Sequence, residues 1–180
     1  MTSHVFVDET KAKRYLVAEA IVDESQLRDI RRVIKTLLLP GQRSVHMKAE
    51  GKPRRHKIAD AIAGLAGLGV RTTIYDVGTV AGTDLDRRAL AIGVLVGDIA
   101  AMQVAARIVF DMDVTLLSFD RQHMIEATRA SAARDRIRYV HLPFASEPAL
   151  AIPDVVAWCW ARGGEWRERI RPIVTDVRVL

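Results

Sequence analysis

Acidic residues follow several short, mostly apolar stretches that have the composition of β-strands. Asp8 with Glu9, Asp76 and Asp111 each end such a stretch, and Asp154 lies near the start of a late apolar helix. Carboxylates gathered at one edge of a sheet repel one another unless a positive charge joins them. The usual partner is a hard divalent cation with oxygen ligands. The pattern therefore predicts a metal-dependent nuclease that uses Mg²⁺ or Mn²⁺.

Each of these acids also has an ordinary structural interpretation. Asp8, Glu9 and Asp76 stand where turns are expected, and aspartate is a common turn residue. Asp154 follows a proline, where a carboxylate simply favours the positive end of a helix. Side chains alternate across a strand, so only one of Asp8 and Glu9 can face a given side of the sheet.

Composition limits the kind of protein. The chain has 180 residues, of which 49% are hydrophobic, so it can bury the core of one domain. Its net charge of +5 suits a polyanionic partner such as nucleic acid, although many proteins are this basic without one. The single cysteine, Cys159, excludes an internal disulfide and a cysteine-built zinc site. Because neither a leader sequence nor a spanning apolar run is visible, we expect a cytoplasmic protein with no membrane partner.

The spacing of apolar residues predicts alternating strands and helices. Strands are expected near residues 5–9, 15–21, 44–48, 70–77, 107–111 and 137–142. Helices are expected near residues 27–38, 54–68, 85–106, 118–133 and 148–161. This order predicts an α/β fold with a mixed sheet that opens with an antiparallel hairpin and carries helices on both faces. One domain would span residues 1–180, with residues 163–180 as a C-terminal arm or edge strand.

Basic residues between the first and second predicted helices suit phosphate contacts. Lys48, Lys52, Arg54 and Arg55 lie at or just before a helix start, where cations oppose the helix dipole. Nearby, His46, Lys48 and Glu50 alternate and would share one face of a strand. A half-buried strand position is the plain interpretation of His46, and proton relay or leaving-group binding is the functional one.

Two segments at opposite ends of the chain resemble an uncharacterised prokaryotic family of ribonuclease H-like proteins. They are Phe6-Val7-Asp8-Glu9-Thr10 and the stretch from Glu147 to Trp158 that contains Ile152-Pro153-Asp154-Val155-Val156-Ala157. The order of elements agrees over about residues 4–162. The resemblance implies a ribonuclease H-like core in which acids hold two divalent cations. It also implies phosphodiester hydrolysis by water.

The resemblance assigns roles to individual acids. Asp8 matches the first-strand position and Asp154 the last-helix position, while Glu50 is the best match for a helix-borne catalytic acid. The later-strand acid stays open among Asp76, Asp111 and Asp120. The expected catalytic set is thus Asp8, Glu50, Asp111 and Asp154, and the expected metal ligands are Asp8, Asp76, Asp111 and Asp154.

The chain departs from the family pattern at two positions. Thr10 stands where serine is common, and Ser44 stands where many relatives carry an acid two residues before the histidine. The second change motivates an alternative function, a catalytically inactive ribonuclease H-like accessory protein that binds nucleic acid or protein. A phosphatase with Asp8 as nucleophile is a third possibility, but such enzymes usually carry an aspartate where Thr10 stands.

Overall fold

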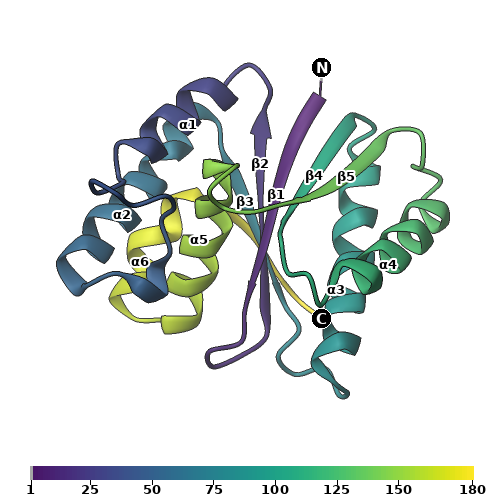
Figure 1. Ribbon diagram of the computed structural model, residues 1–180. Helices are drawn as coiled ribbons and strands as arrows, with labels where there is room; N and C mark the ends of the chain where they lie inside the picture. Colours follow the sequence, from purple (N-terminus) through teal and green to yellow (C-terminus); the bar gives the residue numbers. More distant parts are fainter. Residues whose placement is uncertain (1) are drawn as a thin grey trace.

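The computed structural model describes residues 2–180 and is built on a mixed six-stranded sheet in the order β5-β4-β1-β2-β3-β6 (Figure 1). The strands are β1 (Thr2–Thr10), β2 (Leu16–Asp23), β3 (Arg71–Asp76), β4 (Ala105–Asp111), β5 (Ile137–Leu142) and β6 (Val174–Val179). β1, β2 and β3 pair antiparallel, and the other neighbours pair parallel. The prediction of a mixed sheet that opens with a hairpin is confirmed.

Helices cover both faces of this sheet (Figure 1). The α-helices are α1 (Leu27–Lys35), α2 (Lys52–Gly64), α3 (Asp84–Ala101), α4 (Leu117–Ala130), α5 (Ala151–Arg162) and α6 (Glu165–Ile170). Short 3₁₀ helices are η1 (Met47–Ala49), η2 (Leu65–Leu68), η3 (Pro148–Leu150) and η4 (Arg171–Ile173). One apolar cluster joins the sheet to α1, α2, α5 and α6, and a second joins the other face to α3 and α4.

The alternation of side chains along β1 decides which face each of its terminal acids meets. Phe6 belongs to the cluster beneath α5, whereas Val5 and Val7 belong to the cluster beneath α3. Because successive side chains point to opposite faces, Asp8 lies on the α5 face and Glu9 on the α3 face. Two adjacent carboxylates are thereby directed into different environments.

The strand predicted at residues 44–48 is wrong. This segment is irregular and then forms η1, and both Val45 and Met47 are buried in the α5-side core. The backbone N–H of Met47 donates to Asp154 instead of to a neighbouring strand. The alternation of His46 and Lys48 thus reflects a segment packed on the core, which the sequence cannot distinguish from a strand.

Other boundaries differ less. The predicted helix at 85–106 ends at Ala101, because Gln103 takes a left-handed φ of 57° before β4 begins. α5 starts at Ala151, so Pro153 sits in its first turn, where a missing N–H leaves no hydrogen bond unmade. Residues 165–179 form α6, η4 and β6, and β6 pairs with β3 at the edge of the sheet. Within residues 2–180, none of the helices has the length and apolar character to cross a bilayer.

Candidate active site

Three aspartates from distant parts of the sequence lie on the α5 face of the sheet. β1 and β4 pair in parallel up to Val7 and Phe110, so the next residues in register are Asp8 and Asp111. Asp154 belongs to the first turn of α5, which packs across β1 and β2. Strand tips and a helix start on a packed face give these carboxylates fixed directions.

The electrostatics of Asp8 show that the acids lie close to one another. Burial raises the pKa of Asp8 well above its usual range, and the charges of Asp154, Glu9 and Asp111 raise it further. Burial also raises the pKa of Asp111, with Glu9 and Asp154 again acting in that direction. A carboxylate whose neighbours are other carboxylates favours protonation or a bound cation. The group therefore holds negative charge that the described side chains do not balance.

Asp154 is held in place by the segment that precedes α2. Met47 N–H donates to its Oδ2 at 2.9 Å, and His46 Nδ1 lies 4.0 Å from its Oδ1. The interaction with Asp154 raises the pKa of His46, and the charge of Asp111 acts in the same direction. The ring of His46 also packs on Phe144, with 4.1 Å between centroids. His46 thus belongs to the acid group, a placement that the plain strand interpretation missed.

On the opposite face of the sheet, Glu9 meets a cation. Arg88 of α3 donates from Nη1 to Glu9 Oε2 at 2.5 Å and from Nε and Nη2 to Asp120 at 2.6 and 2.7 Å. His141 Nε2 lies 2.8 Å from the same Asp120 carboxylate. Burial alone would raise the pKa of Asp120, but the hydrogen bonds from Arg88 and His141 lower it. Asp120, one of the three alternatives for the later-strand acid, is fully paired in this buried network.

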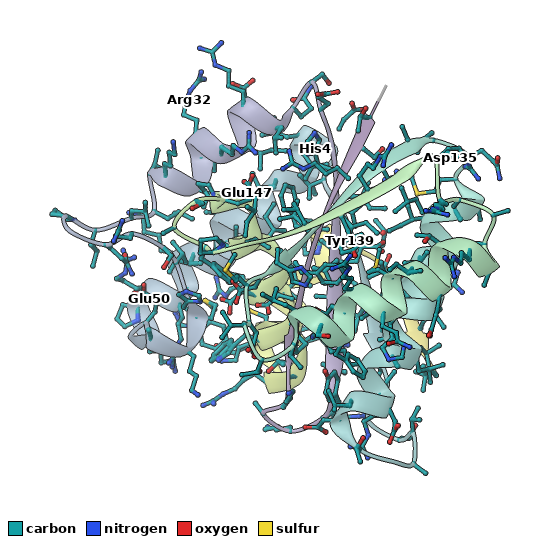
Figure 2. All side chains as sticks on the ribbon, turned by 45° about the vertical axis from the view of Figure 1, so that its right-hand side comes forward. His4, Arg32, Glu50, Asp135, Tyr139 and Glu147 are labelled. Atoms are coloured by element: carbon teal, nitrogen blue, oxygen red, sulfur yellow. The ribbon has the colours of Figure 1, made fainter. Side chains whose placement is uncertain are left out.

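Two other predicted site acids also have partners. Asp76 accepts from Gly78 N–H at 3.0 Å and lies 3.0 Å from Arg14 Nη2, so it closes the turn after β3. Glu50, expected on a helix, lies instead between η1 and α2 (Figure 2) and accepts from Arg54 Nε and from Gln42 Nε2, both at 2.6 Å. The hydrogen bond from Arg54 lowers the pKa of Glu50. Of the three alternatives, Asp111 is therefore the acid that adjoins Asp8.

A cavity of about 650 Å³ opens beside Asp154. It is lined by Glu9, Thr10, Lys11, Ala12, Lys48, Arg55, Asp154, Trp158 and Arg162. The guanidinium groups of Arg55 and Arg162 lie 4.9 and 5.4 Å from the centre of the Trp158 ring. The acid group thus adjoins a cavity with several cations in its wall.

Two of the four residues predicted to bind nucleic acid lie at the cavity, and the other two do not. Lys48 and Arg55 line the cavity, whereas Arg54 is engaged by Glu50 and Lys52 is exposed, with Nζ 3.8 Å from Glu165. Arg162 was missed by the sequence analysis. The spacing of four residues from Asp154 to Trp158 and again to Arg162 places all three on one side of a helix, and this was the available signal.

The acid group has the ligand types that a divalent cation prefers, but its side chains are not arranged around one ion position. Carboxylate oxygens are the hard ligands that Mg²⁺ and Mn²⁺ prefer. Within residues 2–180, however, no three His, Cys, Asp or Glu side chains are arranged so that they could all hold one ion.

Comparisons with known proteins find similarity in structure but not in sequence family. The chain matches no family model and no curated protein. Among solved structures, it is similar to the ribonuclease in the PCNA:RNase HII complex from Archaeoglobus fulgidus, with a TM-score of 0.53 and 17% identity. The match covers 88% of this chain and 72% of that one. At this identity the likeness concerns the fold, and together with the sheet order and its helices it shows that the chain has a ribonuclease H-like fold.

Proposed function

We propose that this protein is a divalent-metal-dependent nuclease that hydrolyses phosphodiester bonds. The observation that carries the proposal is the meeting of Asp8, Asp111 and Asp154 on one face of the sheet, where the charges of Asp154 and Asp111 raise the pKa of Asp8 and the charge of Asp154 raises the pKa of Asp111. The ribonuclease H-like fold supports it, since the similar solved structure is that of a ribonuclease.

Asp8, Asp111 and Asp154 are the residues that would hold the metal. Bound there, two divalent cations would activate a water molecule and stabilise the leaving oxygen of the phosphodiester. Asp8 lies between the other two in the arrangement, because β1 is flanked by β4 in the sheet and covered by α5. Asp8 would therefore hold the metal together with either neighbour.

The neighbouring side chains have separate tasks. Lys48, Arg55 and Arg162 line the cavity next to Asp154 and would hold the phosphates of the substrate strand. His46 carries its proton more firmly than a free histidine and faces the same carboxylate, so it can supply a proton to the leaving oxygen. Glu50 and Arg54 form an ion pair that fixes the segment bearing His46 and Lys48, so Glu50 acts by positioning.

Cleavage assays with single-stranded, duplex and hybrid substrates test the proposal. We expect activity that requires Mg²⁺ or Mn²⁺ and that falls by more than about 100-fold in Asp8→Asn. Mutation of residues that only hydrogen-bond to metal ligands already lowers metal affinity or activity by about 10- to 100-fold. Asp29→Asn is the matched control, because Asp29 is an exposed aspartate of α1 that pairs with Arg32. Equal activity in wild type and Asp8→Asn would reject the proposal.

The same assay chooses the later-strand acid. Asp111→Asn should match the loss seen in Asp8→Asn, whereas Asp76→Asn should retain most of the activity, because Asp76 is occupied by Arg14 and Gly78. The reverse result would assign the ligand to Asp76.

A second candidate function is a binding protein of the same fold without catalysis. It is favoured by the lack, within residues 2–180, of three side chains poised to hold one ion. Calorimetric titration with Mn²⁺ separates the two. Heat that disappears in Asp8→Asn supports the nuclease, whereas a silent titration with retained oligonucleotide binding supports the binding protein.

A further inference from the structure

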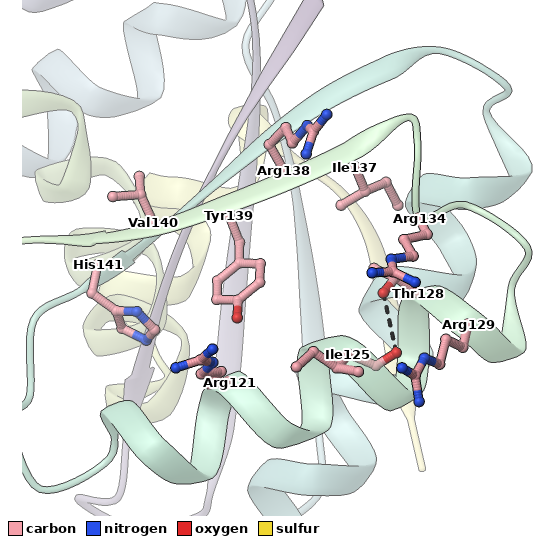
Figure 3. A pocket seen from close by; sticks show the side chains of 10 residues that line it. All are labelled: Arg121, Ile125, Thr128, Arg129, Arg134, Ile137, Arg138, Tyr139, Val140 and His141. Carbon is pink, nitrogen blue, oxygen red and sulfur yellow. Dashed lines mark hydrogen bonds between the residues drawn. The ribbon is translucent and has the colours of Figure 1, made fainter.

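A second basic cavity lies between α4 and β5, the strand at the opposite edge of the sheet from β6. Its volume is about 590 Å³. Arg121 and Arg129 come from α4, Arg134 from the connecting turn, and Arg138 from β5 (Figure 3). The rest of the wall is formed by Ile125, Thr128, Ile137, Tyr139, Val140 and His141.

The four arginines carry charge that the protein does not neutralise. No ion pair within residues 2–180 joins any of them to a carboxylate, whereas Arg14, Arg31, Arg54 and Arg88 each have such a partner. No acidic side chain lines the cavity. The hydroxyl of Thr128 is already bonded to Met124 O at 2.7 Å. Like charges kept together without partners favour an anionic ligand.

The cavity is elongated along β5 rather than built around one point. Arg121 and Arg129 are eight residues apart on α4, which corresponds to about 12 Å along a helix. The side chains of Tyr139 and Ile125 lie between these arginines (Figure 3) and offer apolar surface. Cations spaced at this distance around apolar surface suit several successive phosphates with sugars or bases between them.

One end of the cavity lies near the tip of β4. β5 runs parallel to β4, so His141 pairs with Phe110 and the next residue, Leu142, pairs with Asp111. His141 also contacts Asp120, which is joined through Arg88 to Glu9. The His141 end of the cavity therefore lies beside the tip of β4 on the α3 face, whereas the side chain of Asp111 at that tip lies on the α5 face.

We propose that this cavity binds the phosphate backbone of a nucleic-acid strand, as a track from which the strand passes around the tip of β4 to reach the acid group on the other face of the sheet. Arg121 lies at the end near His141, and Arg129 with Arg134 at the far end. The binding of the strand stands independently, and the continuation to a cleaved bond rests on the proposed nuclease function. An acidic peptide is the competing occupant, and it lacks the regular phosphates and the bases that the elongated wall accommodates.

Binding of a fluorescent single-stranded oligonucleotide, measured by anisotropy without divalent metal, tests the track. All proteins in this measurement carry Asp8→Asn, so that binding is measured without cleavage of the oligonucleotide and whether or not the protein is a nuclease. We expect Arg129→Gln/Arg134→Gln to weaken binding about tenfold and to reduce the slope of log K against log salt by about 1.4, for two lost contacts to a single strand. The control is Arg28→Gln/Arg71→Gln, which removes the same charge from exposed positions on α1 and β3.

Each outcome bears on the proposal. Equal loss in the two double variants would overturn it, because general charge would then explain binding. Displacement of the oligonucleotide by polyglutamate at equal charge concentration would also overturn it, in favour of an acidic protein partner. Selective loss in Arg129→Gln/Arg134→Gln supports the track even if wild type cleaves nothing. If wild type does cleave, the variant should lose activity on long strands and retain it on short ones.

Discussion

The tip of β1 directs consecutive acids into two regions that treat negative charge in opposite ways. On the α5 face, Asp8 is surrounded by Asp111 and Asp154, and the charges of these neighbours raise its pKa beyond the effect of burial. On the α3 face, Glu9 shares Arg88 with Asp120, and the guanidinium and His141 hold the pKa of Asp120 low. Both regions gather carboxylates from distant parts of the chain, with Glu9 and Asp120 on the α3 face, so the presence of acids does not distinguish them.

The difference lies in the built-in cation. The α3-side network is complete without a ligand, because Arg88 supplies three donors to two carboxylates. The α5-side group has the same kind of charge, but among the ion pairs within residues 2–180 the one that reaches it joins His46 to Asp154 at 4.0 Å. An acid cluster that the chain leaves unbalanced is the one that can use a cation from solution. The candidate site is therefore recognised by the lack of a cation beside its acids, because both regions contain carboxylates.

The largest effect is expected from removal of Arg88. Arg88→Met leaves Glu9 and the buried Asp120 without their cation, and breaking such a pair typically costs about 3–5 kcal/mol of unfolding free energy. Denaturant unfolding measures the loss. Arg87→Met is the control, because Arg87 pairs with the exposed Asp84 and should cost less than about 1 kcal/mol. Similar losses in the two variants would mean that the α3-side network is not specially stabilising.

The metal dependence of stability tests the other region. At a Mn²⁺ concentration of about 100 times its dissociation constant, binding should raise the unfolding free energy of wild type by about 2.7 kcal/mol. Asp8→Asn should show little of this gain, and without metal it should be at least as stable as wild type, because it removes a repelling charge. Thermal unfolding with and without Mn²⁺ provides the measurement. A variant that is equally stabilised by the ion would place the metal elsewhere.

The sequence predicted the framework of these regions better than their chemistry. The hairpin of β1 and β2 and the strand at 137–142 follow from local alternation and turn residues, and the structure confirms them. Asp8 and Asp154 could be singled out because a strand tip and a helix start are visible locally. The partner of Asp120 could not, since Arg88 is 32 residues away and meets it only after α3 and α4 pack. The two interpretations of His46 could not be separated for the same reason, because its segment has the alternation of a strand and its position depends on the distant Asp154.

A third buried acid, Glu19, extends the comparison, because within residues 2–180 it accepts a hydrogen bond from Tyr75 and has no ion pair. Burial raises the pKa of Glu19 to about 7, although a hydrogen bond from Tyr75 acts against this shift. A raised folded-state pKa gives stability that is full below 4.5, the unfolded value, and is lost as pH rises toward 7. Glu19→Gln should therefore remove a decline on the order of 2 kcal/mol between these pH values. Parallel slopes for wild type and variant in pH-dependent unfolding would contradict this.

The smallest effect concerns His46, the cation at the edge of the α5-side group. Its raised pKa means that the contact with Asp154 stabilises the fold fully below pH 6.5 and is lost as pH rises through the folded-state value. Both side chains reach solvent, so His46→Gln should cost about 0.5 kcal/mol more at pH 6 than at pH 9, in the range of an exposed ion pair, because the lost packing on Phe144 is the same at both pH values. Unfolding curves at the two pH values measure the difference. A loss at pH 6 as large as that of Arg88→Met would show that histidine balances the acids as arginine does on the other face, and the need for a cation from solution would disappear.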